Sequence, residues 1–267
     1  MKNSNASAKS RGVVLFAFNT DSVNYIHIAE HASRLIRHTL NLPVTLITEA
    51  GVDSDYFDQI VYTENNINNY RTGYAGGTNW RNANRYSAYE LSPYDETLLL
   101  DSDYLVLDDS LIKILDSTQD YSIITENQNM SQSMNSLMGQ INFIWATVVV
   151  FKRTDKSRLL FDLVRRIQHN YSYYRKLYNI QQRNFRNDYA FAIADNILNG
   201  YTLSKGIPWS MLTLDNAISK IELQQNKLVI REDNTAQVIP RQNIHVIDKD
   251  YLQSTAYTEF VEQICQS

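Results

Sequence analysis

The sequence has little cysteine, which cross-links small secreted domains, and it lacks the long apolar runs that form membrane spans. Its 267 residues include one cysteine, four prolines and eight glycines. The single cysteine, Cys265, excludes a disulfide within the chain and fits a reducing compartment. No apolar run is long enough to cross a bilayer, and residues 1–12 are polar and lack the apolar core of a signal peptide. We therefore expect a soluble, cytoplasmic protein without a membrane span and with a disordered tail over residues 1–12.

The sequence also lacks several patterns that are typical of catalytic or repeat proteins. The chain has no glycine-rich phosphate loop, no Ser-His-Asp order, no Cys/His spacing of a zinc site and no internal repeat. Its hydrophobic content of 43% is enough for one large or two small domains. These absences argue against P-loop enzymes, serine hydrolases, zinc modules and solenoids, and they leave a globular enzyme or binding protein.

The order of the apolar segments predicts an α/β fold. Residues 13–18 are typical of a buried strand, residues 25–40 of an amphipathic helix and residues 44–48 of a second strand, which together form a βαβ unit. The same reasoning predicts strands at 58–62, 98–100, 104–107, 121–125 and 141–151, helices at 80–91, 110–115, 157–168 and 189–198, and a hairpin at 227–231 and 238–239. Residues 64–79 and 126–139 lack periodicity and are predicted to be loops. The pattern favours a mostly parallel central sheet flanked by helices.

Two carboxylates directly follow the most apolar of these strands. Asp101 and Asp103 stand one residue apart after Leu98–Leu100, and a second apolar run begins at Tyr104. Open α/β sheets bind ligands at the carboxyl ends of their strands, and paired carboxylates are hard oxygen ligands for Mg²⁺ or Mn²⁺. The alternative is a solvated Asp-Ser-Asp turn, since acidic side chains are normally exposed.

The run from Ser92 to Leu107, Ser-Pro-Tyr-Asp-Glu-Thr-Leu-Leu-Leu-Asp-Ser-Asp-Tyr-Leu-Val-Leu, resembles the core of glycosyltransferases with the GT-A fold. It looks most like the glycogenin and lipopolysaccharide galactosyltransferase group. The resemblance covers roughly residues 13–200 and implies a single GT-A (Rossmann-like) domain over 13–267. Its nucleotide-sugar-binding half would span 13–110 and its acceptor-binding half 111–267. It also implies transfer of a sugar from a nucleoside diphosphate sugar, with a UDP-sugar favoured, to an acceptor hydroxyl.

The resemblance assigns roles to residues along the chain. In this family the Asp-x-Asp motif holds the metal that bridges the donor diphosphate, which implies Mn²⁺ or Mg²⁺ at Asp101 and Asp103. A late histidine supplies a third ligand, a role that His245 would fill. An Asp-rich helix start faces the two sugars, which makes Asp188 the candidate catalytic residue. The candidate donor-binding residues are Asn19, Thr20, Asp21, Arg81, Arg85, Ser102 and Lys249.

Each of these roles has a structural alternative. Asp188 or Asn187 is also a natural helix N-cap. A histidine between apolar residues, as His245 is, often has only a structural role. Arg81 and Arg85 are also compatible with ordinary surface positions. The chain also departs from the family before the strand that ends at Phe151, where Trp145-Ala146-Thr147 replaces the usual Asn-Ser/Ala-Gly, so the sugar pocket is expected to differ.

The charge is unevenly distributed. The whole chain carries −4, yet residues 152–186 hold ten lysines and arginines against two aspartates, a net charge of +8. Tyrosines are interleaved with these cations, and arginines that track phosphates beside aromatic residues that stack bases are typical of nucleic-acid binding. We therefore expect an acceptor surface that suits DNA, as in enzymes that glycosylate hydroxymethylated pyrimidines of phage DNA, which would act in the host cytoplasm. Its candidate residues are Trp145, Tyr174, Arg175, Arg183 and Asn187.

Other functions stay open at this point. The acceptor could be a cell-surface glycan, a lipopolysaccharide or a protein, and the basic segment could be a solvated helix face. A protein of another class, a non-catalytic nucleic-acid-binding protein on a transferase-like scaffold, would account for the same segment. A nucleotidyltransferase would share the metal carboxylates but normally carries the glycine-rich loop that is missing here.

Overall fold

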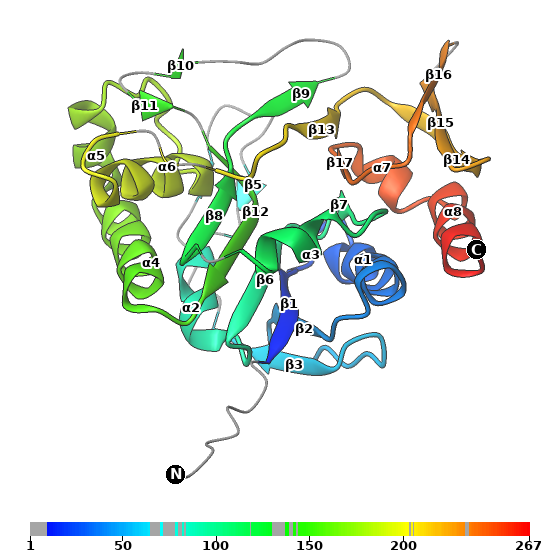
Figure 1. Ribbon diagram of the computed structural model, residues 1–267, viewed down its shortest axis with the longest axis horizontal. Helices are drawn as coiled ribbons and strands as arrows, with labels where there is room; N and C mark the ends of the chain where they lie inside the picture. Colours follow the sequence, from blue (N-terminus) through cyan, green and yellow to red (C-terminus); the bar gives the residue numbers. More distant parts are fainter. Residues whose placement is uncertain are drawn as a thin grey trace, which may run out of the picture.

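The computed structural model describes residues 10–64, 70–71, 78–79, 82, 84–117, 119–129, 137–138, 141–142, 144–202, 204, 206–232 and 235–267. A six-stranded sheet forms its centre, in the order β3-β2-β1-β6-β12-β8 (Figure 1). These strands are β1 (Arg11–Phe16), β2 (Val44–Thr48), β3 (Gln59–Tyr62), β6 (Glu96–Leu100), β8 (Tyr121–Ile124) and β12 (Trp145–Lys152). β12 is antiparallel to both of its neighbours, and all the other strands run in one direction. The mostly parallel sheet expected from the sequence is confirmed.

Helices cover both faces of this sheet, which is why its strands are apolar on both sides. One face packs against α1 (Tyr25–Leu40) and α3 (Ser110–Leu115) through side chains such as Leu15 and Leu100. The other face packs against α4 (Asp155–His169) and α6 (Asn187–Leu198) through Val14 and Leu99, which alternate with the first set. Figure 1 shows the two helix layers on either side of the sheet. This part of the chain therefore forms three layers, with one core on each face of the sheet.

A second, four-stranded sheet lies beside the carboxyl end of β6. Its order is β7-β17-β13-β9, formed by β7 (Tyr104–Leu105), β17 (Ile244–Val246), β13 (Met211–Leu214) and β9 (Asn127–Asn129). His245 pairs with Tyr104 across β7 and β17, and Thr213 pairs with His245 across β13 and β17. This sheet brings segments that are far apart in the sequence to the end of the central strand.

A third core lies under the C-terminal part of the chain. The antiparallel sheet of β14 (Ile218–Gln224), β15 (Lys227–Glu232) and β16 (Thr235–Pro240) packs with α7 (Lys249–Leu252) and α8 (Thr255–Cys265) against the outer side of α1. The Gln263 side chain bonds both the N–H and the C=O of Leu223, which closes this part of the β14 edge. The remaining elements are η1 (Arg85–Ser87), α2 (Ala88–Leu91), α5 (Tyr171–Leu177), β4 (Tyr70–Arg71), β5 (Thr78–Asn79), β10 (Leu137–Met138) and β11 (Ile141–Asn142).

Several predicted boundaries need correction. The first strand begins at Arg11, inside the expected tail, because Arg11 pairs with Glu96 at 2.8 Å while Ser10 bonds Asp95; residues 1–9 lie outside the described residues. Of the helix expected over 80–91, the structure describes η1 and α2. The expected loop 126–139 contains β9 and β10, and the expected strand 141–151 is divided into β11 and β12.

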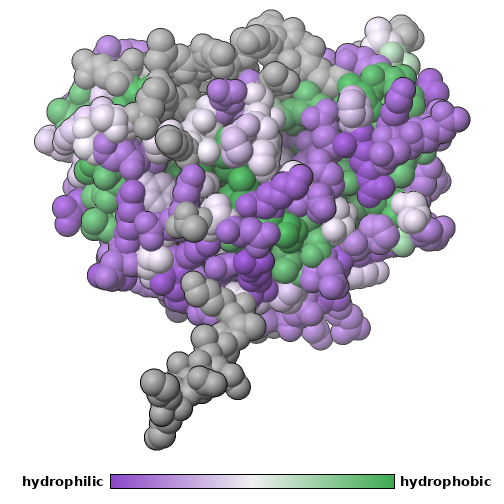
Figure 2. Space-filling view, in the orientation of Figure 1, coloured by the Kyte–Doolittle hydropathy of each residue, from purple (hydrophilic) through white to green (hydrophobic). Residues whose placement is uncertain are grey.

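The surface seen in Figure 2 is largely hydrophilic, and its hydrophobic side chains form separate patches. Within the part of the chain that the structure describes, no helix combines the length and the apolar character needed to cross a membrane. The central sheet draws on both proposed halves of the chain, because β8 and β12 follow residue 110.

Candidate metal centre

Two carboxylates and one imidazole meet where β6 ends. Asp101 follows the last residue of β6, and its N–H donates to the carbonyl of Thr147 on β12 at 3.0 Å. The pairing of β7 with β17 brings His245 beside Asp103. One potential ligand atom from each of Asp101, Asp103 and His245 lies within 4.8 Å of the others. The three residues that the sequence assigned to a metal are therefore together in space.

Asp103 is a mostly buried anion held by a buried cation. Lys249 donates to its Oδ2 at 2.6 Å, and the Asp103 side chain is only 14% exposed. Burial opposes its ionisation, but Lys249 and then His245 outweigh burial and lower the pKa of Asp103. Lys249 also donates to the carbonyls of Val246 and Ile247, at 3.3 and 3.0 Å. All three protons of its ammonium group are thus in use.

Asp101 has a different cation beside it. Arg85, at 2% exposure one of the largest buried side chains, donates from Nη1 to Oδ1 of Asp101. Burial is the main cause that raises the pKa of Asp101; Arg85 opposes it and Asp103 adds to it. The Nε and Nη2 atoms of Arg85 are buried without a hydrogen-bond partner in the described structure. A buried guanidinium with two unused donors is suited to an anionic or hydroxyl ligand.

The orientation of His245 is set by two residues that the sequence did not indicate. Thr213 on β13 donates its hydroxyl proton to Oδ1 of Asn127 at 2.7 Å. Because that proton is used, the same hydroxyl can only accept from Nδ1 of His245, 3.4 Å away. Nδ1 is therefore held as a donor to Thr213, and Nε2 is the nitrogen that faces the carboxylates. Asn127 lies in a polar stretch that reads as a loop, so no sequence signal pointed to it.

These residues fit a divalent metal ion. Nε2 of His245 and Oδ1 of Asp103 lie 3.5 Å apart, and this Oδ1 is buried without a hydrogen-bond partner among the described residues. A carboxylate oxygen and an imidazole nitrogen this close are satisfied by a proton or a metal ion between them. Two carboxylates with one imidazole suit Mn²⁺, which accepts nitrogen more readily than Mg²⁺ does. The Nδ1 bond to Thr213 is the outer-sphere contact that metal-binding histidines usually make.

Asp188 lies at the start of α6, close enough to Asp101 to contribute to its raised pKa. It is not the N-cap of this helix, as one reading of the sequence had it, because the cap position falls on Arg186. Its Oδ1 accepts the N–H of Ala146 at 3.0 Å, and its Oδ2 accepts from Arg186 at 2.9 Å. Asn187 is buried beside it, with Oδ1 unpartnered in the described structure. Trp145 contacts His245 edge to face, with ring centroids 6.1 Å apart.

The candidate nucleoside-binding residues lie between β1 and α1. Asn19 uses its side-chain oxygen to accept the N–H of Ile26 at 3.0 Å, and Thr20 closes a turn with Val23. Asp21 is exposed, and Ser102, which stands between Asp101 and Asp103 in the sequence, is buried. Arg81 lies outside the described residues.

The basic segment is less available than its charge suggests. Arg158 and Arg165 pair with Asp155 and Asp162 one helical turn away, and Arg175 donates to the carbonyl of Ile180. Of its aromatic residues, Tyr171 and Tyr178 are buried in the core and Tyr174 packs against it, while Tyr173 is 65% exposed. Arg183 is exposed.

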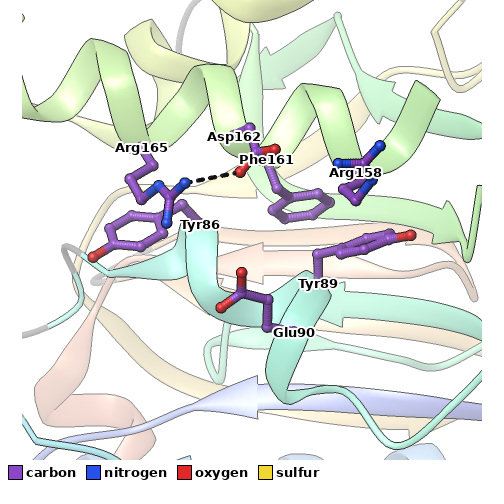
Figure 3. A pocket seen from close by; sticks show the side chains of 7 residues that line it. All are labelled: Tyr86, Tyr89, Glu90, Arg158, Phe161, Asp162 and Arg165. Atoms are coloured by element: carbon purple, nitrogen blue, oxygen red, sulfur yellow. Dashed lines mark hydrogen bonds and ion pairs between the residues drawn. The ribbon is translucent and has the colours of Figure 1, made fainter. Parts of the chain in front are cut away.

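A small pocket lies between α2 and α4, lined by Tyr86, Tyr89, Glu90, Arg158, Phe161, Asp162 and Arg165 (Figure 3). It contains none of the predicted site residues. Its empty volume of about 240 Å³, open solvent included, is below the roughly 300–1,000 Å³ of typical ligand pockets. It does not suit a sugar nucleotide.

Comparison with known proteins supports the fold assignment. No protein-family profile matches the sequence, and no curated protein sequence matches it. Among solved structures, the galactosyltransferase LgtC, determined with donor and acceptor sugar analogues, aligns over 96% of this chain and 95% of its own, with a TM-score of 0.52 and 14% identity. The chain shares the fold of this galactosyltransferase. The glycosyltransferase GlyE of Streptococcus pneumoniae TIGR4 matches 72% of this chain at 16% identity and a TM-score of 0.42, and the match spans 43% of GlyE.

Proposed function

We propose that this protein is a metal-dependent glycosyltransferase that moves a sugar from a nucleoside diphosphate sugar, with a UDP-sugar favoured, to an acceptor hydroxyl. The observation that carries the proposal is the convergence of Asp101, Asp103 and His245 at the carboxyl end of the central strand. The fold shared with a galactosyltransferase supports it. Asp101, Asp103 and the Nε2 of His245 would hold Mn²⁺ or Mg²⁺, which when bound would neutralise the departing diphosphate.

The two cations of the cluster have separate tasks in this proposal. Lys249 donates to Asp103 and to the carbonyls of Val246 and Ile247, so in this proposal it holds Asp103 in place and does not bind the donor, the role that the resemblance implies. Arg85 keeps two buried donors unused and is the cation that meets the donor. Because Arg85 is fixed before the substrate arrives, little reorganisation is needed when it binds.

Asp188 and Asn187 form the sugar-facing side of the proposed site. Asp188 links the beginning of β12 to α6 through Ala146, and the unpartnered oxygen of Asn187 can accept from a sugar hydroxyl. Both residues lie on the same helix turn, so they are positioned together. Asp188 would orient the donor sugar or the acceptor hydroxyl near the metal carboxylates.

The test is metal-dependent hydrolysis of a panel of sugar nucleotides by the purified protein. We expect Mn²⁺-dependent release of nucleoside diphosphate from one of them, and at least a hundredfold loss in Asp101→Asn and Asp103→Asn. Asp162→Asn, which changes an exposed carboxylate of α4, is the matched control. Equal turnover in all four proteins would remove the cluster from the reaction and end the proposal.

For the acceptor we propose DNA that carries hydroxymethylated bases. Support comes from Tyr173, Lys176 and Arg183, which are exposed on the segment that leads into Asp188. An exposed ring can stack on a base while the cations contact phosphates. Duplex DNA should bind with an affinity that falls steeply with salt, and Arg183→Ala should reduce the slope by about one. Absence of binding at low salt would exclude DNA and leave glycan, lipid-linked or protein acceptors, while the donor assay would stand.

A further inference from the structure

Helix α1 carries a pair of histidines that belongs to none of the groups of residues described so far. His27 and His31 are one turn apart, so their side chains share a face of the helix. Their Nε2 atoms are 3.2 Å apart, and the rings meet edge to face with centroids 4.5 Å apart. His31 is buried between α1 and α8, next to Tyr257 and Thr258, whereas His27 is 39% exposed. The Nε2 of His31 therefore lies in the core, whereas the Nε2 of His27 belongs to a side chain that reaches solvent.

The separation of the two nitrogens matches that of two ligands on one metal ion. With metal–nitrogen bonds of 2.0–2.1 Å and a tetrahedral angle, two histidine nitrogens lie about 3.3 Å apart. We propose that His27 and His31 chelate a transition-metal ion of the Zn²⁺ class at an accessory site on α1, with water completing its coordination on the exposed side. The site shares no residue with the carboxylate cluster, and it does not depend on the function proposed above.

A carboxylate outside the pair supports this arrangement. Oε2 of Glu30 lies 3.8 Å from Nδ1 of His27, the nitrogen that faces away from His31. Ser54 donates to the other oxygen of Glu30 at 2.8 Å, which fixes the carboxylate. At this distance the carboxylate attracts a proton on Nδ1 without hydrogen-bonding it, and a small shift would give the carboxylate contact that metal-binding histidines usually make.

His31 is also in the form that binds metal. Burial, with smaller contributions from His27 and Arg34, lowers its pKa to about 4, so the imidazole is neutral at physiological pH. In the metal-free pair one Nε2 donates to the other. When a metal takes the place of that proton, the Thr258 hydroxyl, 3.3 Å from the same Nε2 of His31, has to turn away, and His31 carries its own proton on Nδ1.

Calorimetric titration of the full chain with Zn²⁺ tests the proposal. Wild type should bind one equivalent more than His27→Ala, and His38→Ala, which removes an exposed histidine of the same helix, should match wild type. Glu30→Gln should weaken this equivalent about tenfold. His27→Gln keeps a polar side chain and serves as a second variant in case His27→Ala does not fold. The circular dichroism of each variant checks that it is folded. Equal stoichiometry in wild type and both His27 variants would overturn the site and would leave the carboxylate cluster untouched.

Discussion

The carboxylate cluster and helix α4 both concentrate charged side chains, but they fix them in different ways. Asp103 is 14% exposed and bonds Lys249, which lies 146 positions further along the chain. Asp162 is 40% exposed and pairs with Arg165 on the next turn of the same helix. The first pair forms only when the chain is folded, whereas the second needs only the helix. Functional sites typically use charged side chains that are buried and brought together from distant segments. A count of charges along the sequence does not distinguish such a buried pair from an exposed pair within one helix.

Asp103→Asn should have the largest effect. It leaves the ammonium of Lys249 buried without its anion, so we expect about 3 kcal/mol of lost stability in metal-free protein, in addition to the loss of activity. The measurement is urea unfolding in the presence of a chelator. The Asp-x-Asp motif alone suggests a different result for stability. It suggests carboxylates that only bind a metal, so that their neutralisation would not destabilise the fold.

A double variant separates the two losses. Asp103→Asn combined with Lys249→Met removes both charges and should recover most of the stability while activity stays absent. If the single variant is as stable as wild type, the pair is not a buried ion pair in solution, and the contrast with α4 fails.

Thr213→Val should have an intermediate effect. It takes away the hydroxyl between Asn127 and His245, so both lose a buried partner at a cost of about 1–3 kcal/mol. With the Nδ1 proton of His245 unsupported, affinity for Mn²⁺ should fall by about 10–100-fold. Mn²⁺ titration calorimetry measures this directly. Thr213→Ser retains the hydroxyl and should bind Mn²⁺ as wild type does; equal weakening in both variants would point to packing instead of hydrogen bonding.

Arg165→Ala should have the smallest effect. Its ion pair with Asp162 is solvated, with both side chains at least 40% exposed, so stability should change by less than about 1 kcal/mol and Mn²⁺ affinity should not change. Thermal unfolding at low and high salt is the check. A loss as large as that of Asp103→Asn would show that α4 is as dependent on its charges as the cluster is.

Local patterns predicted the regular elements well. The bounds of α1, α3 and β2 agree with the sequence expectation. In α1 the strong periodicity is reinforced by caps at both ends. Asn24 accepts the N–H of His27 at the start of α1, and Asn41 ends the helix in a left-handed conformation. The residues of the cluster were predicted because two carboxylates after an apolar strand are a local signal, and the family resemblance added His245.

The rest depended on contacts that the sequence does not display. The small sheet pairs Asn127–Asn129 with Met211–Thr213, so a polar stretch without periodicity became strand β9. Asp188 occupies a position where an N-cap residue is common, but its side chain accepts a hydrogen bond from the backbone N–H of Ala146. The tyrosines of the basic segment were expected to be available to bases, but Tyr171 at the start of α5 and Tyr178 just after its end pack into the core.

The separation of the cluster's residues in the sequence has a consequence for folding. Asp101 and His245 meet only where β17 pairs with β7, so the site depends on a contact between segments far apart in the sequence. A chain that has formed the central sheet but not this pairing would present the carboxylates without the imidazole. A metal that binds only the native arrangement would stabilise the finished fold over such intermediates by mass action. Metal affinity would then report whether a given molecule has completed folding.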